Sequence, residues 1–317
     1  MAIASGRSVT SEKLVATLAD ALVARCKRRD VTGNRTALIA GIAGGQGSGK
    51  TTLARALVPA LAQRGRPALA LSLDDFYLTR AQRAELGRAV HPLLALRGVP
   101  GTHDVALAHA TLDALVGLAA GTAVGVPRFD KGRDDRVPRA EWPEQSGPID
   151  VVLLEGWCLG ARPARGSERL AAPLNALERE EDPEGTARYY SELQLAGPYQ
   201  TLFARLQWLA FLRVPDMDSV RRWREQQENE LRAAAGAGAP EAMDPAGLER
   251  FVQSFERITR RMLARPPDAD LTIQLDGEHR VVSYARVVRR GRSQFPAGTR
   301  SGQSRRVSNT YRRSRRA

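Results

Sequence analysis

Gly44-Gly-Gln-Gly-Ser-Gly-Lys50-Thr51 is the stretch of this 317-residue sequence from which the rest can be interpreted. It matches the pattern G-x-x-x-x-G-K-[ST], in which the backbone N–H groups of a glycine-rich turn surround phosphate oxygens. A short apolar run, 37–42, precedes it and a helical pattern over 50–63 follows it. A turn between a buried strand and a helix is the context that this motif requires. The sequence therefore predicts a phosphate-binding loop for ATP or GTP.

Each part of the loop has a chemical task. Lys50 is expected to reach the β- and γ-phosphates, and the Thr51 hydroxyl to hold Mg²⁺. The N-terminus of the following helix adds its dipole to the attraction of phosphate. The residues expected to bind the nucleotide are Gly44, Gly45, Gln46, Gly47, Ser48, Gly49, Lys50, Thr51 and Thr52.

Further apolar runs alternate with helical patterns along the chain. The runs are 68–73, 149–155, 206–214 and 271–275, and the helical patterns are 104–118, 216–235 and 245–263. Strands that are apolar on both faces and separated by helices indicate a parallel sheet covered on both sides. We therefore expect an α/β P-loop NTPase domain over 1–288, with a helix of the N-terminal segment 1–34 packed on it.

Two acids follow the second and third apolar runs, where ligands of such sheets bind. Asp74 lies in Ser72-Leu-Asp-Asp-Phe-Tyr77, and Glu155 ends the third run. A small-molecule kinase needs a carboxylate beside the P-loop to accept the proton of the attacking hydroxyl, a task suited to Asp74. Glu155 matches a Walker B acid that binds Mg²⁺ directly or through water. Alternatively, Asp74 or Asp75 merely caps the next turn.

The charge of the chain is concentrated at its C-terminal end. Of the net charge of +13, twelve positive charges come from arginines between Arg280 and Ala317, and no acid follows Glu278. We expect 289–317 to be a disordered Arg-rich tail that binds nucleic acid at most non-specifically. A nucleic-acid-dependent NTPase is the weaker alternative, because the body is nearly neutral and aromatic residues make up only 5% of the chain.

Cysteine usage and hydropathy indicate a cytoplasmic protein without a membrane partner. Cys26 and Cys158 fit neither a zinc spacing nor a disulfide framework. No run approaches the length of a membrane span, and the N-terminus lacks the basic and apolar pattern of a signal peptide.

Taken together, these motifs resemble kinases of the uridine kinase, phosphoribulokinase and pantothenate kinase group. Within that group the sequence is most similar to the D-glycerate 3-kinase family of plants and fungi and its bacterial relatives. The resemblance extends over roughly residues 35–276. It rests on the P-loop and on Leu73–Thr79, Arg97–Asp104, Pro127–Lys131, Leu153–Trp157 and Trp223–Glu228.

The resemblance implies ATP-dependent phosphorylation of D-glycerate to 3-phosphoglycerate. Asp74 is the expected base because it occupies the first position of Asp-x-Phe-Tyr. A carboxylate on the acceptor needs cations or several donors, although each candidate could also be a solvated surface group. The substrate-binding candidates are Asp74, Tyr77, Arg97, His103, Arg128 and Lys131.

The helical pattern after the fourth run carries two further catalytic candidates, Arg221 and Arg224. In the family this region is a lid, and arginines that close over the γ-phosphate stabilise the transition state. An ordinary charged helix face, with Arg and Glu paired along it, is the alternative. Alternative acceptors are uridine, pantothenate or a sugar phosphate. A nucleotide-binding regulator without catalysis is disfavoured, because the expected base, the Walker B acid and the lid arginines are all present.

Overall fold

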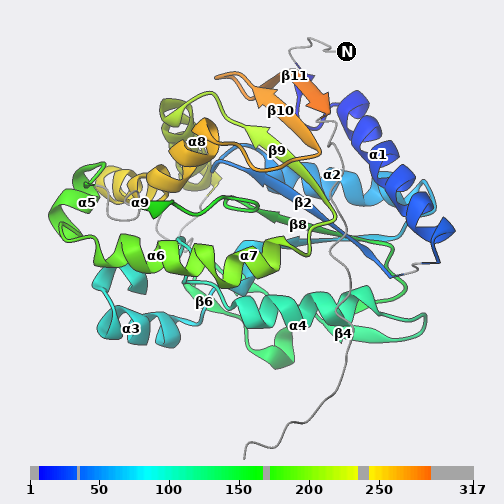
Figure 1. Cartoon of the computed structure of the whole chain (residues 1–317), viewed down its shortest axis with the longest axis horizontal. Coiled ribbons are helices and arrows are strands. Elements are labelled where there is room, and N and C mark those ends of the chain that lie inside the picture. Colours follow the sequence, from blue (N-terminus) through cyan, green and yellow to red (C-terminus); the bar gives the residue numbers. More distant parts are fainter. Residues whose placement is uncertain (1–6, 34–35, 167–171, 235–242, 287–317) are drawn as a thin grey trace, which may run out of the picture. The chain divides into compact units, whose positions relative to one another are not determined.

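The computed structural model describes residues 7–33, 36–166, 172–234 and 243–286. Its main sheet has seven strands in the order β1-β11-β10-β9-β2-β8-β3 (Figure 1). The five strands from β10 to β3 run parallel, which confirms the predicted α/β fold. They are β2 (Leu38–Gly44), β3 (Ala68–Ser72), β8 (Val151–Gly156), β9 (Trp208–Arg213) and β10 (Leu271–Leu275).

The remaining strands are antiparallel and were not expected from the sequence. β11 (Arg280–Arg286) pairs with β10, and β1 (Arg7–Ser8) pairs with β11. Two small antiparallel two-stranded sheets lie outside the main sheet. They pair β4 (Ala123–Gly125) with β7 (Glu144–Ser146), and β5 (Phe129–Asp130) with β6 (Asp135–Arg136).

Helices cover both faces of the sheet, and alternate residues of each strand supply the two cores. Along β2, Leu38 and Ile42 pack with α1 (Glu12–Val31) and α2 (Lys50–Ala62). Ile39 and Ala43 face the opposite core, which α4 (Val105–Val116), α6 (Thr186–Ala196) and α7 (Pro198–Phe203) complete (Figure 1). Burial on both faces explains why the strands are apolar throughout.

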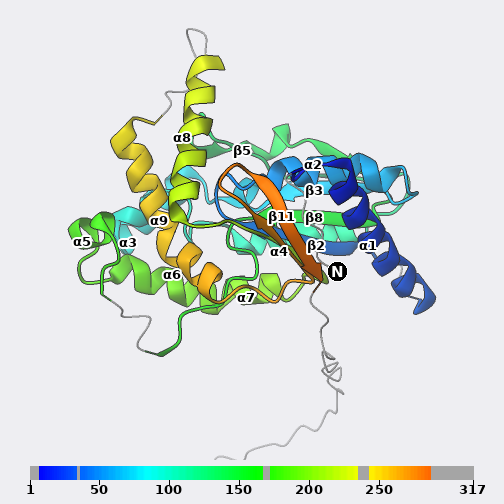
Figure 2. The ribbon, with the colours of Figure 1, turned by 90° about the horizontal axis from the view of Figure 1, so that it is seen from above.

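The other helices frame the edge of the sheet near the P-loop. α8 (Met217–Ala234) and α9 (Pro245–Ala264) lie side by side (Figure 2), and both match the predicted helical patterns. α3 (Arg80–Ala89) and α5 (Ala176–Glu181) are shorter, as are the 3-10 turns η1 (Leu73–Phe76), η2 (Pro92–Ala95) and η3 (Arg139–Glu141). Within the described ranges, no helix is long and apolar enough to cross a membrane. The predicted tail, 289–317, lies outside the described residues, and the domain boundary at 288 stays a prediction.

Candidate active site

The P-loop connects β2 to α2 with a backbone that only glycine adopts readily at two positions. Gly47 and Gly49 have φ angles of +74° and +87°, in the left-handed region. A Cβ atom on Gly47 would lie 2.8 Å from the Cβ of Trp223. The loop therefore keeps its curvature and enters α2 at Lys50, where the free N–H groups of a helix N-terminus attract anions.

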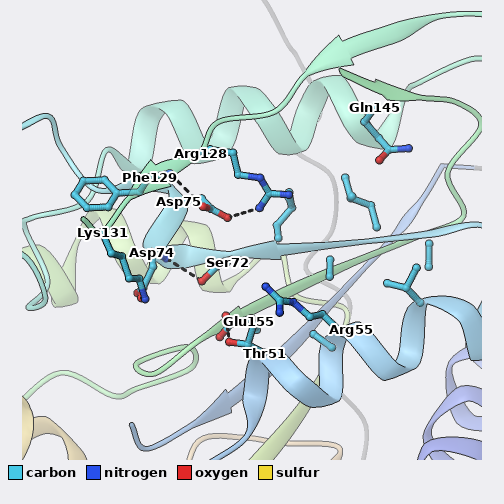
Figure 3. Close-up of a pocket in the computed structure, with 16 residues that line it drawn as sticks. Thr51, Arg55, Ser72, Asp74, Asp75, Arg128, Phe129, Lys131, Gln145 and Glu155 are labelled. Carbon is cyan, nitrogen blue, oxygen red and sulfur yellow. Dashed lines mark hydrogen bonds and ion pairs between the residues drawn. The ribbon is translucent and has the colours of Figure 1, made fainter. Parts of the chain in front are cut away.

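Lys50 and Thr51 are the last two residues of the motif. Lys50 contacts the loop itself, and Thr51 contacts the predicted Walker B acid. The Lys50 ammonium donates a hydrogen bond to the Gly45 carbonyl at 2.9 Å. Burial lowers the pKa of Lys50, while Glu155 and Asp74 oppose that shift. The Thr51 hydroxyl donates to Oε1 of Glu155 at 2.7 Å (Figure 3).

The sheet register explains why Glu155 reaches the P-loop. In β8, Glu155 lies opposite Ile42 of β2 on one side and Ser72 of β3 on the other. The three carboxyl ends therefore meet at one edge, as expected for parallel strands. A hydroxyl beside a buried carboxylate offers the oxygen ligands that Mg²⁺ prefers. No cluster of three or more His, Cys, Asp or Glu side chains suits a metal ion in the described part of the chain.

Asp74 lies in η1, directly after β3, and its carboxylate faces a cation. Lys131 donates a hydrogen bond from its ammonium to Oδ2 of Asp74 at 2.8 Å. Burial acts to raise the pKa of Asp74, but the Lys131 charge and hydrogen bond outweigh it, so the pKa is lowered overall. Asp74 is therefore ionised at neutral pH. It lines the same cavity as Glu155 (Figure 3), and the charge of Lys50 also acts on it.

The neighbouring acid, Asp75, has a different environment. It accepts hydrogen bonds from Arg128 at 2.8 Å and from the Phe129 backbone N–H at 3.3 Å. Asp75 is only 8% exposed. Burial raises its pKa, although the charge of Arg128 acts to lower it. Asp75 thus connects η1 to the loop before β5 (Figure 3). Arg128, a substrate-binding candidate, is engaged in that connection.

A cavity of about 650 Å³ joins these groups. It runs along α2 and the edge strand β3, and Figure 3 shows its polar residues facing one another. Among its lining residues are Thr51, Asp74, Asp75, Arg128, Lys131 and Glu155. The structure therefore brings the metal-binding candidates, the expected base and two substrate-binding candidates to one hollow.

Arg97 lies in a cluster that sequence reasoning did not find. Its guanidinium pairs with Asp134, whose other oxygen accepts from Arg83 at 2.7 Å. Arg83 has no exposed side-chain surface, and both guanidinium groups lie over the Phe129 ring at 5.4 and 5.6 Å. Asp134 holds the two arginines from a left-handed backbone conformation, with φ +51°. The only signal in the sequence was a charged loop, 130–136, between apolar runs.

Tyr77 and His103 stack face to face with ring centroids 4.2 Å apart. The contact follows from the backbone, since Tyr77 and His103 form an isolated antiparallel bridge. Burial, and next the charge of Asp74, raise the pKa of Tyr77 well above its usual value. Both substrate-binding candidates are thus buried beside the expected base.

Arg221 and Arg224, the two arginines of the expected lid, have different partners. Arg221 binds Asp218 at 3.0 Å and Glu249 of α9 at 3.3 Å, and so connects α8 to α9. Arg224 pairs with Glu228. Burial lowers the pKa of Arg224, and the charges of Arg97 and Asp74 also act on it. Arg224 therefore lies on the side of α8 that faces the expected acceptor site.

A contact between His279 and the P-loop was also not predicted from the sequence. His279 lies at the turn between β10 and β11, and its Nε2 donates to the Gly47 carbonyl at 2.8 Å. Its ring stacks on Trp223 with centroids 3.9 Å apart. The turn comes close to the P-loop because β9 pairs with β2 and β10 pairs with β9 in the sheet. No periodic pattern in the sequence predicts this contact.

Comparisons with known proteins identify the family. No family model matches the chain. D-glycerate 3-kinase of Arabidopsis thaliana, a chloroplastic protein, is 32% identical over 76% of the chain, although the chain spans only 53% of the length of that relative. An uncharacterized kinase of Schizosaccharomyces pombe is 36% identical over 63% of this chain and 73% of its own length.

A solved structure agrees with these sequence relatives. D-glycerate 3-kinase of Cryptococcus neoformans superposes with a TM-score of 0.70 at 24% identity, covering 87% of this chain and all of that one. At this identity the superposition shows the fold alone. The sequence identity over most of the fission yeast kinase shows that the chain belongs to the same family of kinases, and the D-glycerate 3-kinase of Arabidopsis thaliana is a named relative of the chain.

Proposed function

We propose that this chain transfers the γ-phosphoryl group of Mg-ATP to the 3-hydroxyl of D-glycerate. The observation that carries the proposal is the placement of an ionised Asp74 at the sheet edge that also holds Lys50 and the Thr51–Glu155 pair. The cavity at that edge offers a proton acceptor and oxygen ligands for a metal, and Lys50 adds a cation for phosphate next to Thr51. Its relatives named as glycerate kinases support the choice of acceptor.

The nucleotide would be held by the P-loop residues 44–52. Backbone N–H groups of the loop and of the α2 N-terminus would bind the phosphate oxygens, and Lys50 would move from the Gly45 carbonyl to the β- and γ-phosphates. Mg²⁺, held by Thr51 and Glu155, would supply charge neutralisation at the β- and γ-phosphates. The hydrogen bond between the Thr51 hydroxyl and the Glu155 carboxylate supports this assignment of the metal ligands, because it brings the two side chains together.

Asp74 would accept the proton of the attacking hydroxyl. As the oxygen–phosphorus bond to the acceptor forms, the bond between the γ-phosphorus and the bridging oxygen breaks and ADP leaves with that oxygen. Lys131 keeps Asp74 ionised, so that the carboxylate is ready at neutral pH. Arg224, and Arg221 if α8 moves toward the phosphates, would stabilise the charge on the transferred group.

The acceptor carboxylate would bind to Arg97. This guanidinium already pairs with a carboxylate, Asp134, and Arg224 adds a second positive charge nearby. Tyr77 and His103 would form the wall of the site next to Asp74. Lys131 and Arg128 line the adjoining cavity and complete the set of predicted substrate-binding residues.

Product identification tests the proposal. The full chain is incubated with ATP, Mg²⁺ and D-glycerate, uridine, pantothenate or a sugar phosphate in parallel, and the phosphorylated product is identified by mass spectrometry and NMR. We expect 3-phosphoglycerate as the product from D-glycerate and little turnover with the other acceptors. Turnover with uridine and none with D-glycerate would overturn the choice of acceptor but keep the kinase. A cytoplasmic location and polyanion binding through the basic tail stay predictions.

A further inference from the structure

His103 carries a ring nitrogen that the structure leaves without a partner. The residue is 5% exposed, and its Nε2 is buried with no hydrogen bond to any described residue. The other nitrogen, Nδ1, lies 2.6 Å from the hydroxyl oxygen of Tyr199 in α7. Buried polar groups in folded proteins are almost always paired, so an unpaired one next to an expected base points to a ligand.

The hydrogen bonds around Tyr199 determine which His103 nitrogen carries the proton. The Tyr199 oxygen accepts a hydrogen bond from the Gly101 backbone N–H at 3.0 Å. Among the described residues, Nδ1 of His103 is the one acceptor within hydrogen-bond distance of this buried hydroxyl, so the Tyr199 O–H donates to Nδ1. Burial lowers the pKa of His103 to about 4, with Asp74 opposing the shift, so the ring is neutral at pH 7. A neutral ring with an unprotonated Nδ1 carries its proton on Nε2.

We propose that His103 donates this Nε2–H to the acceptor hydroxyl that is not phosphorylated, and that Tyr199 is the positioning residue that holds the imidazole in this tautomer. The inference rests on the proposed function, because it assigns the third polar group of D-glycerate. The reacting 3-hydroxyl must face Asp74. The carboxylate suits the charged Arg97, which leaves the 2-hydroxyl for an uncharged donor.

Kinetics with two acceptors test the contact to the 2-hydroxyl. D-glycerate and 3-hydroxypropionate both carry a 3-hydroxyl and a carboxylate, but only D-glycerate has the 2-hydroxyl. His103→Leu should lower kcat/KM for D-glycerate about tenfold, the order expected for one uncharged hydrogen bond. The same variant should lower kcat/KM for 3-hydroxypropionate severalfold less than that for D-glycerate, because 3-hydroxypropionate lacks the 2-hydroxyl.

Matched variants separate this effect from damage to the fold. His103→Gln places an amide N–H near the position of Nε2 and should recover part of the loss. His109→Leu, on α4 and outside the site, is the control for replacing a histidine with leucine and should behave as wild type. Equal losses with both acceptors in His103→Leu, without rescue in His103→Gln, would overturn the assignment.

Nitrogen NMR tests the tautomer without any turnover. In the full chain with ¹⁵N-labelled histidine there are four ring systems to resolve, and His103→Gln assigns the signals of His103. We expect an unprotonated Nδ1 and a protonated Nε2 in the wild type at neutral pH. Tyr199→Phe keeps the ring but removes the O–H, and should shift His103 toward the other tautomer and raise the KM for D-glycerate. A protonated Nδ1 in the wild type would overturn the inference, even if D-glycerate proved not to be the acceptor.

Discussion

Asp74→Asn removes the proposed proton acceptor while the shape of the side chain is retained. The amide oxygen can still accept the hydrogen bond that Lys131 donates at 2.8 Å. Because the Lys131 side chain is 63% exposed, loss of the charge pair should cost the fold at most about 1 kcal/mol. The variant should therefore fold and bind ATP like the wild type.

The expected loss of turnover is about a hundredfold, which corresponds to about 2.7 kcal/mol of activation free energy. General bases contribute about 10²–10⁴-fold, and a base contributes less when its pKa lies far below the operating pH. The pKa of Asp74 is lowered because Lys131 outweighs the effect of burial. Asp74 should therefore contribute at the low end of that range.

The assay couples ADP release to a spectroscopic signal with D-glycerate as acceptor, and calorimetry measures ATP binding separately. Asp75→Asn is the matched control, because Asp75 is the adjacent carboxylate and binds Arg128 instead of facing Lys131. We expect the control to lower the melting temperature but to keep most of its turnover. Turnover of Asp74→Asn within about threefold of wild type would refute the assignment of the base, since such a residual rate lies outside the range for general bases.

Three further variants test neighbouring parts of the site. Lys131→Met removes the charge that lowers the pKa of Asp74, so that pKa rises and the acid limb of the kcat/KM profile should move to higher pH; an unshifted limb would contradict the pairing. Glu155→Gln should raise the Mg²⁺ concentration for half-maximal activity about tenfold or more, measured by titrating Mg²⁺ at saturating ATP. Gly47→Ala forces an L-residue to φ +74° and places a Cβ 2.8 Å from Trp223, so it should raise the KM for ATP and cost roughly 1–2 kcal/mol of stability in denaturant unfolding.

The sequence predicted the parts of the site that depend on strand ends. In a parallel sheet the carboxyl ends of neighbouring strands meet at one edge, so the P-loop, Asp74 and Glu155 had to lie close together once the strands were identified. The register of β8 between β2 and β3 then aligned Glu155 with Thr51. The strands can be identified from the hydropathy of short segments, and parallel strands joined by helices follow a right-handed connection rule, so this alignment can be predicted from the sequence.

The parts that could not be predicted depend on contacts between distant segments. Arg83 looks like an exposed helix residue in the sequence, yet it is fully buried because Asp134, in a loop about fifty residues later, neutralises it. His279 reaches Gly47 only because β11 turns back along β10. The β11 sequence, Arg280-Val-Val-Ser-Tyr-Ala-Arg286, does not show a clear alternation of apolar and polar residues, and the charged residues at its ends obscure the strand pattern. Periodicity contains no information about such pairs.

The adjacent acids Asp74 and Asp75 show how the structure refines an ambiguity that the sequence leaves open. Either one could have been the base, since both follow β3. The 3-10 turn sends their side chains to different surroundings, and the two pKa values shift in opposite directions: Lys131 lowers that of Asp74, whereas burial raises that of Asp75. Carboxyl groups whose surroundings separate their pKa values in this way take different roles. The acid that binds a buried backbone N–H and Arg128 is engaged in holding a loop. Asp74, whose cation is an exposed and movable lysine, is the one that a substrate hydroxyl can approach.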